Sequence, residues 1–284
     1  MNLFEKAQQM SAIYRENPKL SVLFVGGSVS RGWQDEYSDI ELFLLWDRAP
    51  KDEDRLTPIE KVNGTILDFH PYEDNEWSES FVIDQTKFEI SNFLTATAED
   101  YIKDVCKNGD SSLDKQCLLG AIIDGIPHKG ESRLNEMKTA LETYPEHLKS
   151  NMILEHLDFG GPWQNRSALL HRGDYLMLHR TMTGVSMNLM AILSALNKQY
   201  IHHPKFKWIK ETSERFDIKP KYFSDRLLKV FGKLEPDEGV QTLETLIEDT
   251  FHLIENECPN ITIHKLKSNA QSLRPMSGKA ESIR

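Results

Sequence analysis

Long apolar runs are absent from this 284-residue sequence. No stretch approaches the roughly eighteen consecutive apolar residues that a membrane-spanning helix needs. The first six residues, MNLFEK, lack the basic flank and apolar core of a signal peptide. We therefore expect a cytoplasmic protein with no membrane partner.

Cysteine is scarce, and its spacing is uninformative. The three cysteines are an odd number at wide intervals, Cys106, Cys117 and Cys258. This pattern gives neither a disulfide framework nor a zinc-binding motif. We interpret all three as ordinary buried or partly buried thiols.

Positively charged residues are also in deficit. The sequence has 34 Lys and Arg against 44 Asp and Glu, which gives a formal net charge of −10. Proteins that bind a duplex backbone usually show a basic footprint, so a nucleic-acid partner is not expected. The acidity suits a protein that binds divalent cations or a cationic small molecule.

The chain does contain two kinds of periodic pattern. An amphipathic helix is predicted from Leu3 to about Asn17, followed by short runs rich in β-branched and aromatic residues that predict strands. Asp84-Gln85-Thr86 predicts a hairpin turn between the last two runs. The predicted strands are Ser21–Val25, Ile40–Trp46, Thr65–Phe69, Phe81–Ile83 and Phe88–Ile90.

From about Thr97 the apolar period is helical almost to the end. These patterns predict an α+β chain with a strand-containing front part, residues 1–110, and an all-helical part, residues 111–264. Residues 265–284 are polar and predict a flexible tail. The predicted helices are Tyr101–Val105, Leu113–Ile123, Leu134–Leu141, Leu148–Phe159, Trp163–Leu196, Tyr222–Phe231 and Val240–Ile254.

Two carboxylates interrupt the second predicted strand. Asp39 and Glu41 are one residue apart, so on a strand they share a face and repel each other. A divalent cation between them removes the repulsion, and oxygen-only ligands favour magnesium or manganese over zinc.

The turn before this strand supplies a complementary feature. Gly26 and Gly27 allow a backbone to approach a ligand closely, and Ser28 can cap the helix that follows. Arg31, one turn further on, can pair with phosphates at the same place. The sequence therefore predicts a site for a metal-bound nucleotide.

Gly27-Ser28, ten further residues and Asp39-Ile40-Glu41 together resemble the signature of the polymerase-beta-like nucleotidyltransferase superfamily. The stretch from Tyr37 to Glu41 resembles in particular the aminoglycoside, or kanamycin-type, branch. The resemblance implies a small mixed β-sheet catalytic domain, residues 1–110, followed by a helical domain. It also implies magnesium- or manganese-assisted transfer of a nucleoside monophosphate, with release of pyrophosphate.

The same resemblance implies a third carboxylate on a neighbouring strand. Glu89 lies in the matching context, and alternation places it on the face opposite Phe88 and Ile90. Asp68 is the alternative. Asp39, Glu41 and Glu89 are therefore the predicted metal ligands.

In the helical part the resemblance implies two further residues. Asp158 matches the carboxylate that deprotonates the acceptor, with Glu155 as the alternative. Lys207, or else Lys205, is the expected contact to the triphosphate. In related enzymes a phosphate-binding lysine follows the base by four residues, whereas this chain has Pro162.

We thus expect an adenylyltransferase that uses ATP and a small-molecule hydroxyl, an aminoglycoside-like antibiotic being one such acceptor. Two alternatives stay open: a protein-modifying nucleotidyltransferase and a catalytically inactive nucleotide-binding module. The acceptor and the oligomeric state do not follow from the sequence.

Overall fold

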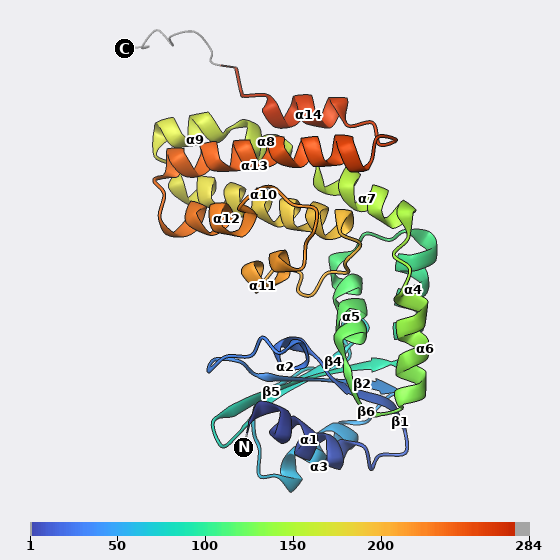
Figure 1. Cartoon of the computed structure of the whole chain (residues 1–284). Coiled ribbons are helices and arrows are strands. Elements are labelled where there is room, and N and C mark those ends of the chain that lie inside the picture. The colour runs from blue at the N-terminus through green and yellow to red at the C-terminus, as the bar shows by residue number, and fades with distance from the viewer. Residues whose placement is uncertain (1, 276–284) are drawn as a thin grey trace. The chain divides into compact units, whose positions relative to one another are not determined.

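A computed structural model describes residues 2–275, whose contacts fall into two units. Unit 1 comprises the chain up to Pro145 together with Tyr200–Pro204. Unit 2 comprises Glu146–Gln199 and the chain from Lys205 onward. Figure 1 labels most of the elements of both units.

Unit 1 is built on a six-stranded sheet with the order β3-β4-β5-β2-β1-β6. The β2–β5 pair is parallel and every other pair is antiparallel, so the sheet is mixed. This confirms the predicted fold class, a small mixed sheet followed by helices. The strands are β1 Leu20–Val25, β2 Ile40–Trp46, β3 Thr65–Phe69, β4 Trp77–Ile83, β5 Thr86–Leu94 and β6 Ile126–Lys129.

One face of the sheet forms the core of unit 1. Leu42 on β2 and Phe88 and Ile90 on β5 are buried against α1 (Leu3–Tyr14) and α3 (Asp52–Lys61). Both helices lie below the sheet in Figure 1. Because side chains alternate along a strand, the odd-numbered residues of β2 and β5 point to the opposite face. That opposite face carries the predicted carboxylates.

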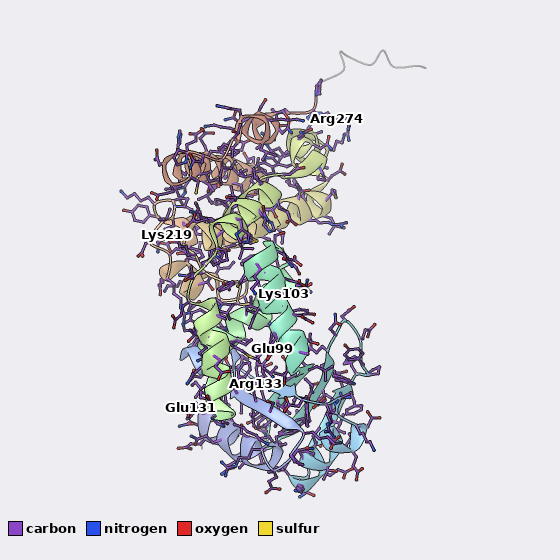
Figure 2. The ribbon with its side chains drawn as sticks, turned by 90° about the vertical axis from the view of Figure 1, so that its right-hand side faces the viewer. Glu99, Lys103, Glu131, Arg133, Lys219 and Arg274 are labelled. Atoms are coloured by element: carbon purple, nitrogen blue, oxygen red, sulfur yellow. The ribbon has the colours of Figure 1, made fainter. Side chains whose placement is uncertain are left out.

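Four more helices complete unit 1: α2 Gly27–Arg31, α4 Thr95–Asn108, α5 Leu113–Asp124 and α6 Glu131–Leu141. Arg133 on α6 ties this group together, because its guanidinium lies 2.9 Å from Glu99 on α4 and 3.0 Å from Asp47 after β2. Figure 2 shows Glu99 and Arg133 side by side, with Lys103 further along α4. The expected boundary after residue 110 therefore moves to Pro145, since β6 joins the sheet beside β1.

In the described part of unit 2, all the regular elements are helices, and the core of the unit surrounds α10. Met182 and Leu189 on α10 are fully buried, and the helix packs against α7 and α13. None of the helices within residues 2–275 has the length and apolar character required to cross a bilayer. The helices are α7 Glu146–His156, α8 Gly160–Gln164, α9 Arg166–Arg172, α10 Tyr175–Leu196, α11 Ile209–Glu214, α12 Phe223–Gly232, α13 Pro236–Glu257 and α14 His264–Gln271.

Two predictions for this unit were wrong. The expected continuous helix Trp163–Leu196 is divided, because Gly173 ends α9 with a left-handed φ of 69°. The predicted tail begins with a helix, α14, that is held in place. Trp163 Nε1 donates to the Ala270 carbonyl at 3.1 Å, and Arg166 donates to the Ser272 carbonyl at 3.1 Å. The rest of that tail, residues 276–284, lies outside the described residues.

Candidate active site

Parallel pairing of β2 with β5 brings three predicted carboxylates to one face of the sheet. Glu41 is paired with Glu89, and Ile40 with Phe88. Asp39 immediately precedes β2 and has the same parity as Glu41. The structure therefore places Asp39, Glu41 and Glu89 on the face opposite the core. We call these three residues the carboxylate row.

A lysine that the sequence analysis did not consider joins the row. Lys87 on β5 makes an ion pair with Glu89, and its ammonium nitrogen lies 3.8 Å from Asp39 Oδ2. The hydrogen bond to Glu89 raises the pKa of Lys87, and the charges of Glu89 and Asp39 act in the same direction. The sequence did contain a signal for Lys87. It is two residues from Glu89 on the same strand, so the two side chains point to the same face of the sheet.

The predicted turn at Gly26 and Gly27 contacts the carboxylate row at Glu41. The Gly26 N–H donates to the Glu41 carbonyl at 2.9 Å, so the turn continues the β1–β2 pairing. Gly27 has a φ of +63°, and a Cβ atom built on it would lie 2.4 Å from both Cδ and Oε1 of Glu41. The Glu41 carboxylate thus packs directly against the Gly27 backbone, and only glycine leaves room for it.

Ser28 and Arg31 occupy other places than expected. Ser28 lies inside α2 and is 6% exposed, and the residue that caps α2 is Gly26, which has no side chain to donate or accept. Arg31 is equally enclosed: its Nε lies 2.7 Å from Asp124 Oδ2 on α5, and its side chain is 5% exposed. The N-cap position of α2 is thus taken by Gly26 and not by Ser28, and Arg31 has Asp124 as an ion-pair partner. The nucleotide-binding roles of Ser28 and Arg31 stay predictions.

Arg31 instead belongs to a cluster that fixes α2. Its guanidinium carbon lies 5.6 Å from the Trp33 ring centre, and the Trp33 ring meets the His202 ring edge to face at 5.7 Å. His202 Nδ1 is 3.5 Å from the same Asp124 oxygen. The cluster connects α2, α5 and residues 200–204.

The two candidates for the third carboxylate share a face but differ in distance from Glu41. Asp68 on β3 accepts a hydrogen bond from Ser80 Oγ at 3.1 Å, and Ser80 pairs with Glu89. In the strand order, Glu89 is one strand from Glu41 and Asp68 is three. At about 4.8 Å per strand, Asp68 is therefore roughly 14 Å from the β2 backbone. This spacing favours Glu89 as the partner of Glu41.

A polar pocket of about 260 Å³ lies beside Glu89 on this face. Its lining includes Asp68, His70, Ser80, Lys87 and Glu89. Polar side chains at its wall suit a hydroxyl-rich or charged ligand better than an apolar one.

The donor chemistry of the carboxylate row fits a hard divalent cation, since all its side-chain ligands would be oxygens. The arrangement is nevertheless not a gathered metal cage. Within residues 2–275, no group of three or more His, Cys, Asp or Glu side chains lies close enough together to hold one ion. The positive charge between Asp39 and Glu89 comes from Lys87.

The predicted residues of the helical part belong to unit 2. Asp158 is exposed in the turn after α7, outside the helix expected there, and its Oδ1 accepts a hydrogen bond from the Gly160 N–H at 3.0 Å. Glu155 is exposed near the end of α7. Lys207 is exposed just before Trp208, the N-cap residue of α11, which has a φ of 57°. The carboxylate row lies in unit 1, so the roles of Asp158 and Lys207 remain predictions.

The cysteines are unsuited to nucleophilic chemistry. All three are free thiols, Cys258 being buried and the others half-buried. Burial raises the pKa of Cys117 to about 12, and the nearby charge of Asp114 acts in the same direction. Because the thiolate is the reactive form, this thiol is inert at neutral pH.

A buried polar network, not foreseen from the sequence, stabilises the core face. Arg55 on α3 and Glu79 on β4 form an ion pair at 2.7 Å with both side chains at 0% exposure. The Asn92 amide donates to Glu79, and Trp46 Nε1 donates to Asn92 Oδ1 at 2.9 Å. Burial raises the pKa of Glu79 to about 7, although Arg55 acts in the opposite direction. The network links α3 with β4, β5 and β2.

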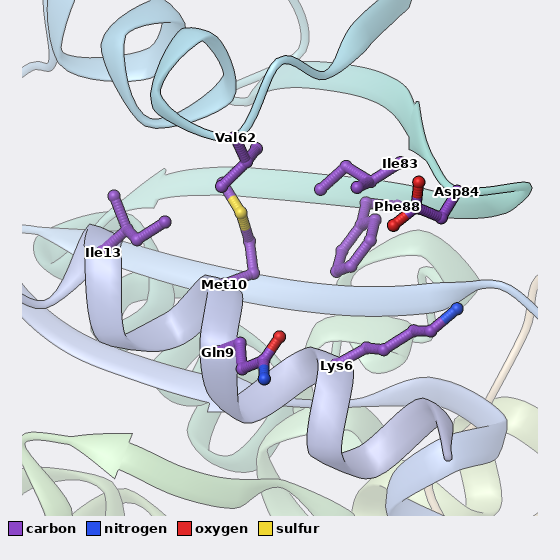
Figure 3. A pocket seen from close by; sticks show the side chains of 8 residues that line it. All are labelled: Lys6, Gln9, Met10, Ile13, Val62, Ile83, Asp84 and Phe88. Atoms are coloured by element: carbon purple, nitrogen blue, oxygen red, sulfur yellow. The ribbon is translucent and has the colours of Figure 1, made fainter. Parts of the chain in front are cut away.

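A second pocket of about 250 Å³ opens on the core side of the sheet. Figure 3 shows Met10, Val62 and Phe88 around it, with Lys6 and Asp84 at one end. Phe88 points away from the face that carries Glu89, its neighbour in sequence. This pocket is therefore separate from the carboxylate row.

Residues 111–209 match a family model described as a domain of unknown function, DUF4037. No curated protein matches the chain. Among solved structures, the chain is similar to a nucleotidyltransferase-like protein from Exiguobacterium sibiricum 255-15, with 10% identity, a TM-score of 0.41, and coverage of 89% of this chain and 75% of that one.

Proposed function

We propose that this protein is a metal-dependent nucleotidyltransferase that moves a nucleoside monophosphate from a triphosphate, with ATP as the expected donor, to a hydroxyl of a small molecule. The observation that carries the proposal is the meeting of Gly27 with Glu41, beside Asp39 and Glu89 on one face of a mixed sheet. The resemblance of this stretch to the polymerase-beta-like signature supports the same reaction.

In the proposed reaction, the acceptor oxygen attacks the α-phosphorus and the bond to the bridging oxygen of pyrophosphate breaks. Asp39, Glu41 and Glu89 would hold magnesium or manganese, which supplies charge neutralisation for the triphosphate. Gly27 brings a backbone without a side chain to the same place. Asp158 would take the proton of the acceptor hydroxyl, and Lys207 would contact the triphosphate as a point charge.

Pyrophosphate release tests this proposal. Purified protein is incubated with magnesium and each of the four ribonucleoside triphosphates, together with hydroxylated small molecules that include an aminoglycoside. Pyrophosphate should form only when a suitable acceptor is present. Asp39→Asn should abolish release, whereas Glu36→Gln, which removes an equal charge from an exposed residue nearby, should leave it unchanged. Equal rates in both variants would contradict the proposal.

A second candidate is a nucleotide-binding module without catalysis. The observation that favours it is Lys87, which pairs with two of the three carboxylates that the reaction needs. Calorimetric binding of a triphosphate, with no pyrophosphate formed against any acceptor, would select this candidate. Label transferred from a triphosphate to protein in a cell lysate would instead select a protein-modifying enzyme.

A further inference from the structure

We propose that Lys87 is a built-in counter-ion of the carboxylate row and that a divalent cation must displace its ammonium group to bind there. This inference rests on the proposed function for the location of the metal. It goes further by assigning to Lys87 a regulatory role in metal binding that no motif in the sequence indicates.

The geometry places one positive charge between two of the proposed ligands. The Lys87 ammonium makes an ion pair with Glu89 and lies 3.8 Å from Asp39 Oδ2. Parallel pairing of β2 and β5 brings these groups together, since it sets Ile40 beside Phe88 and Glu41 beside Glu89. The ammonium thus occupies a position in which a cation would bridge the two strands.

The charges of the row show what Lys87 contributes. Three carboxylates on adjacent strands repel one another, and like charges at paired positions destabilise a sheet. Lys87 offsets part of this repulsion. Arg31, another cation of unit 1, is bound to Asp124 at 2.7 Å. Lys6 donates to Thr86 at 2.6 Å and lines the pocket on the core side of the sheet.

Exposure explains why Lys87 can be displaced. Its side chain is 41% exposed and that of Glu89 is 45% exposed, so neither group is locked in place by packing. Lysine carries a compact charge on a flexible four-carbon stem, which can move into solvent at little cost. A divalent cation brings twice the charge to the same oxygens. The metal and the ammonium therefore compete, and the lysine lowers the apparent affinity for the metal.

Manganese binding without nucleotide tests this competition. Lys87→Met keeps much of the stem and removes the charge. We expect it to bind Mn²⁺ about fivefold tighter or more than the parent, because one unit charge about 4 Å from the ligands is gone. Lys61→Met is the matched control, since it also removes an exposed lysine from an ion pair, the one with Glu16 at 3.2 Å. Lys87→Arg retains the charge and should resemble the parent. Binding is measured by electron paramagnetic resonance of free Mn²⁺.

Thermal unfolding gives an independent readout. In chelator, Lys87→Met should melt at a lower temperature than the parent, because Asp39 and Glu89 lose their counter-ion. Saturating Mn²⁺ should raise the melting temperature of Lys87→Met by more than it raises that of the parent. Equal Mn²⁺ affinity in parent and Lys87→Met, or weaker binding by the variant, would overturn the inference. Pyrophosphate release by the parent is scored separately, so a failed lysine role is distinguishable from a failed enzyme assignment.

Discussion

Gly27→Ala is the sharpest probe of the proposed site, because the structure predicts two separable effects. Gly27 has a φ of +63°, a conformation that costs alanine about 1–2 kcal/mol. The added Cβ would also lie 2.4 Å from Cδ and Oε1 of Glu41 and 2.8 Å from Oε2, far inside contact distance. The carboxylate must therefore leave the position in which the turn and the row meet.

Gly32→Ala provides the matched control. Gly32 has a nearly equal φ of +71° and no atom within 4 Å of its hypothetical Cβ. Gly32→Ala should therefore lose only the stability that a positive φ costs an alanine. We expect both variants to lose about 1–2 kcal/mol of unfolding free energy. The excess loss in Gly27→Ala should be small, because the obstructing group is the end of a flexible side chain.

The functional effects should differ strongly. Gly27→Ala should abolish the Mn²⁺-dependent rise in melting temperature and the release of pyrophosphate, whereas Gly32→Ala should retain both. Urea unfolding followed by circular dichroism measures the stability, and manganese binding measures the site. In a Glu41→Ala background, the added methyl group at position 27 should cost no more than the one at position 32. Full metal affinity in Gly27→Ala, or equal losses of metal affinity in the two variants, would refute this account of the turn.

Two further predictions concern groups around the site and in the core. Arg31→Ala should lower the unfolding free energy by about 1–3 kcal/mol, because Asp124 would lose its partner at 2.7 Å; unchanged urea unfolding would contradict the structural role. The pKa of Glu79 is about 7 in the folded protein, against an ordinary value of 4.5. Between these two pH values the folded protein keeps a proton on Glu79 that the unfolded protein has lost. The free energy of unfolding should therefore fall as the pH rises from 4.5 to 7. Glu79→Gln should remove that slope from unfolding curves measured between pH 4.5 and 7, and an unaltered slope would assign it to other groups.

Much of the sheet follows from local pattern. Ile40–Trp46 and Thr65–Phe69 were predicted with the bounds that β2 and β3 have, because β-branched and aromatic runs bounded by turn residues identify strands. The hairpin turn at Asp84 and Gln85 was also predicted, and both residues have positive φ there. These features depend on residues close together in the chain.

The elements that were missed depend on distant partners. β6, Ile126–Lys129, has four residues including Pro127, so it carries almost no strand pattern of its own and forms by pairing with β1. α3 contains Pro58 and few apolar residues. Its buried Arg55 is held by Glu79. Propensity is a weak guide where tertiary contacts decide the outcome.

The same distinction applies to the proposed site. The shared face of Asp39 and Glu41 follows from strand alternation alone. The approach of Gly27 to Glu41 depends on the antiparallel pairing of β1 with β2, which sets Val25 beside Leu42. The partner of Arg31 could not be foreseen, because Asp124 lies 93 residues further along the chain and its position depends on how α5 packs. An arginine one turn after a glycine-rich turn suits a phosphate ligand or an ion pair equally well by sequence, and only the neighbouring helix distinguishes the two.

Lys87 shows most clearly what strand register adds. Its parity with Glu89 is visible in the sequence, yet its meeting with Asp39 requires that β2 and β5 run parallel with Ile40 beside Phe88. A slip of one residue would place the apolar side chain of Phe88 opposite Asp39 and turn Lys87 toward the core. Burial of Phe88 and Ile90 on the core face forbids that slip, because it would exchange apolar side chains for charged ones. The hydrophobic core therefore fixes the register, and the register places a lysine among the carboxylates.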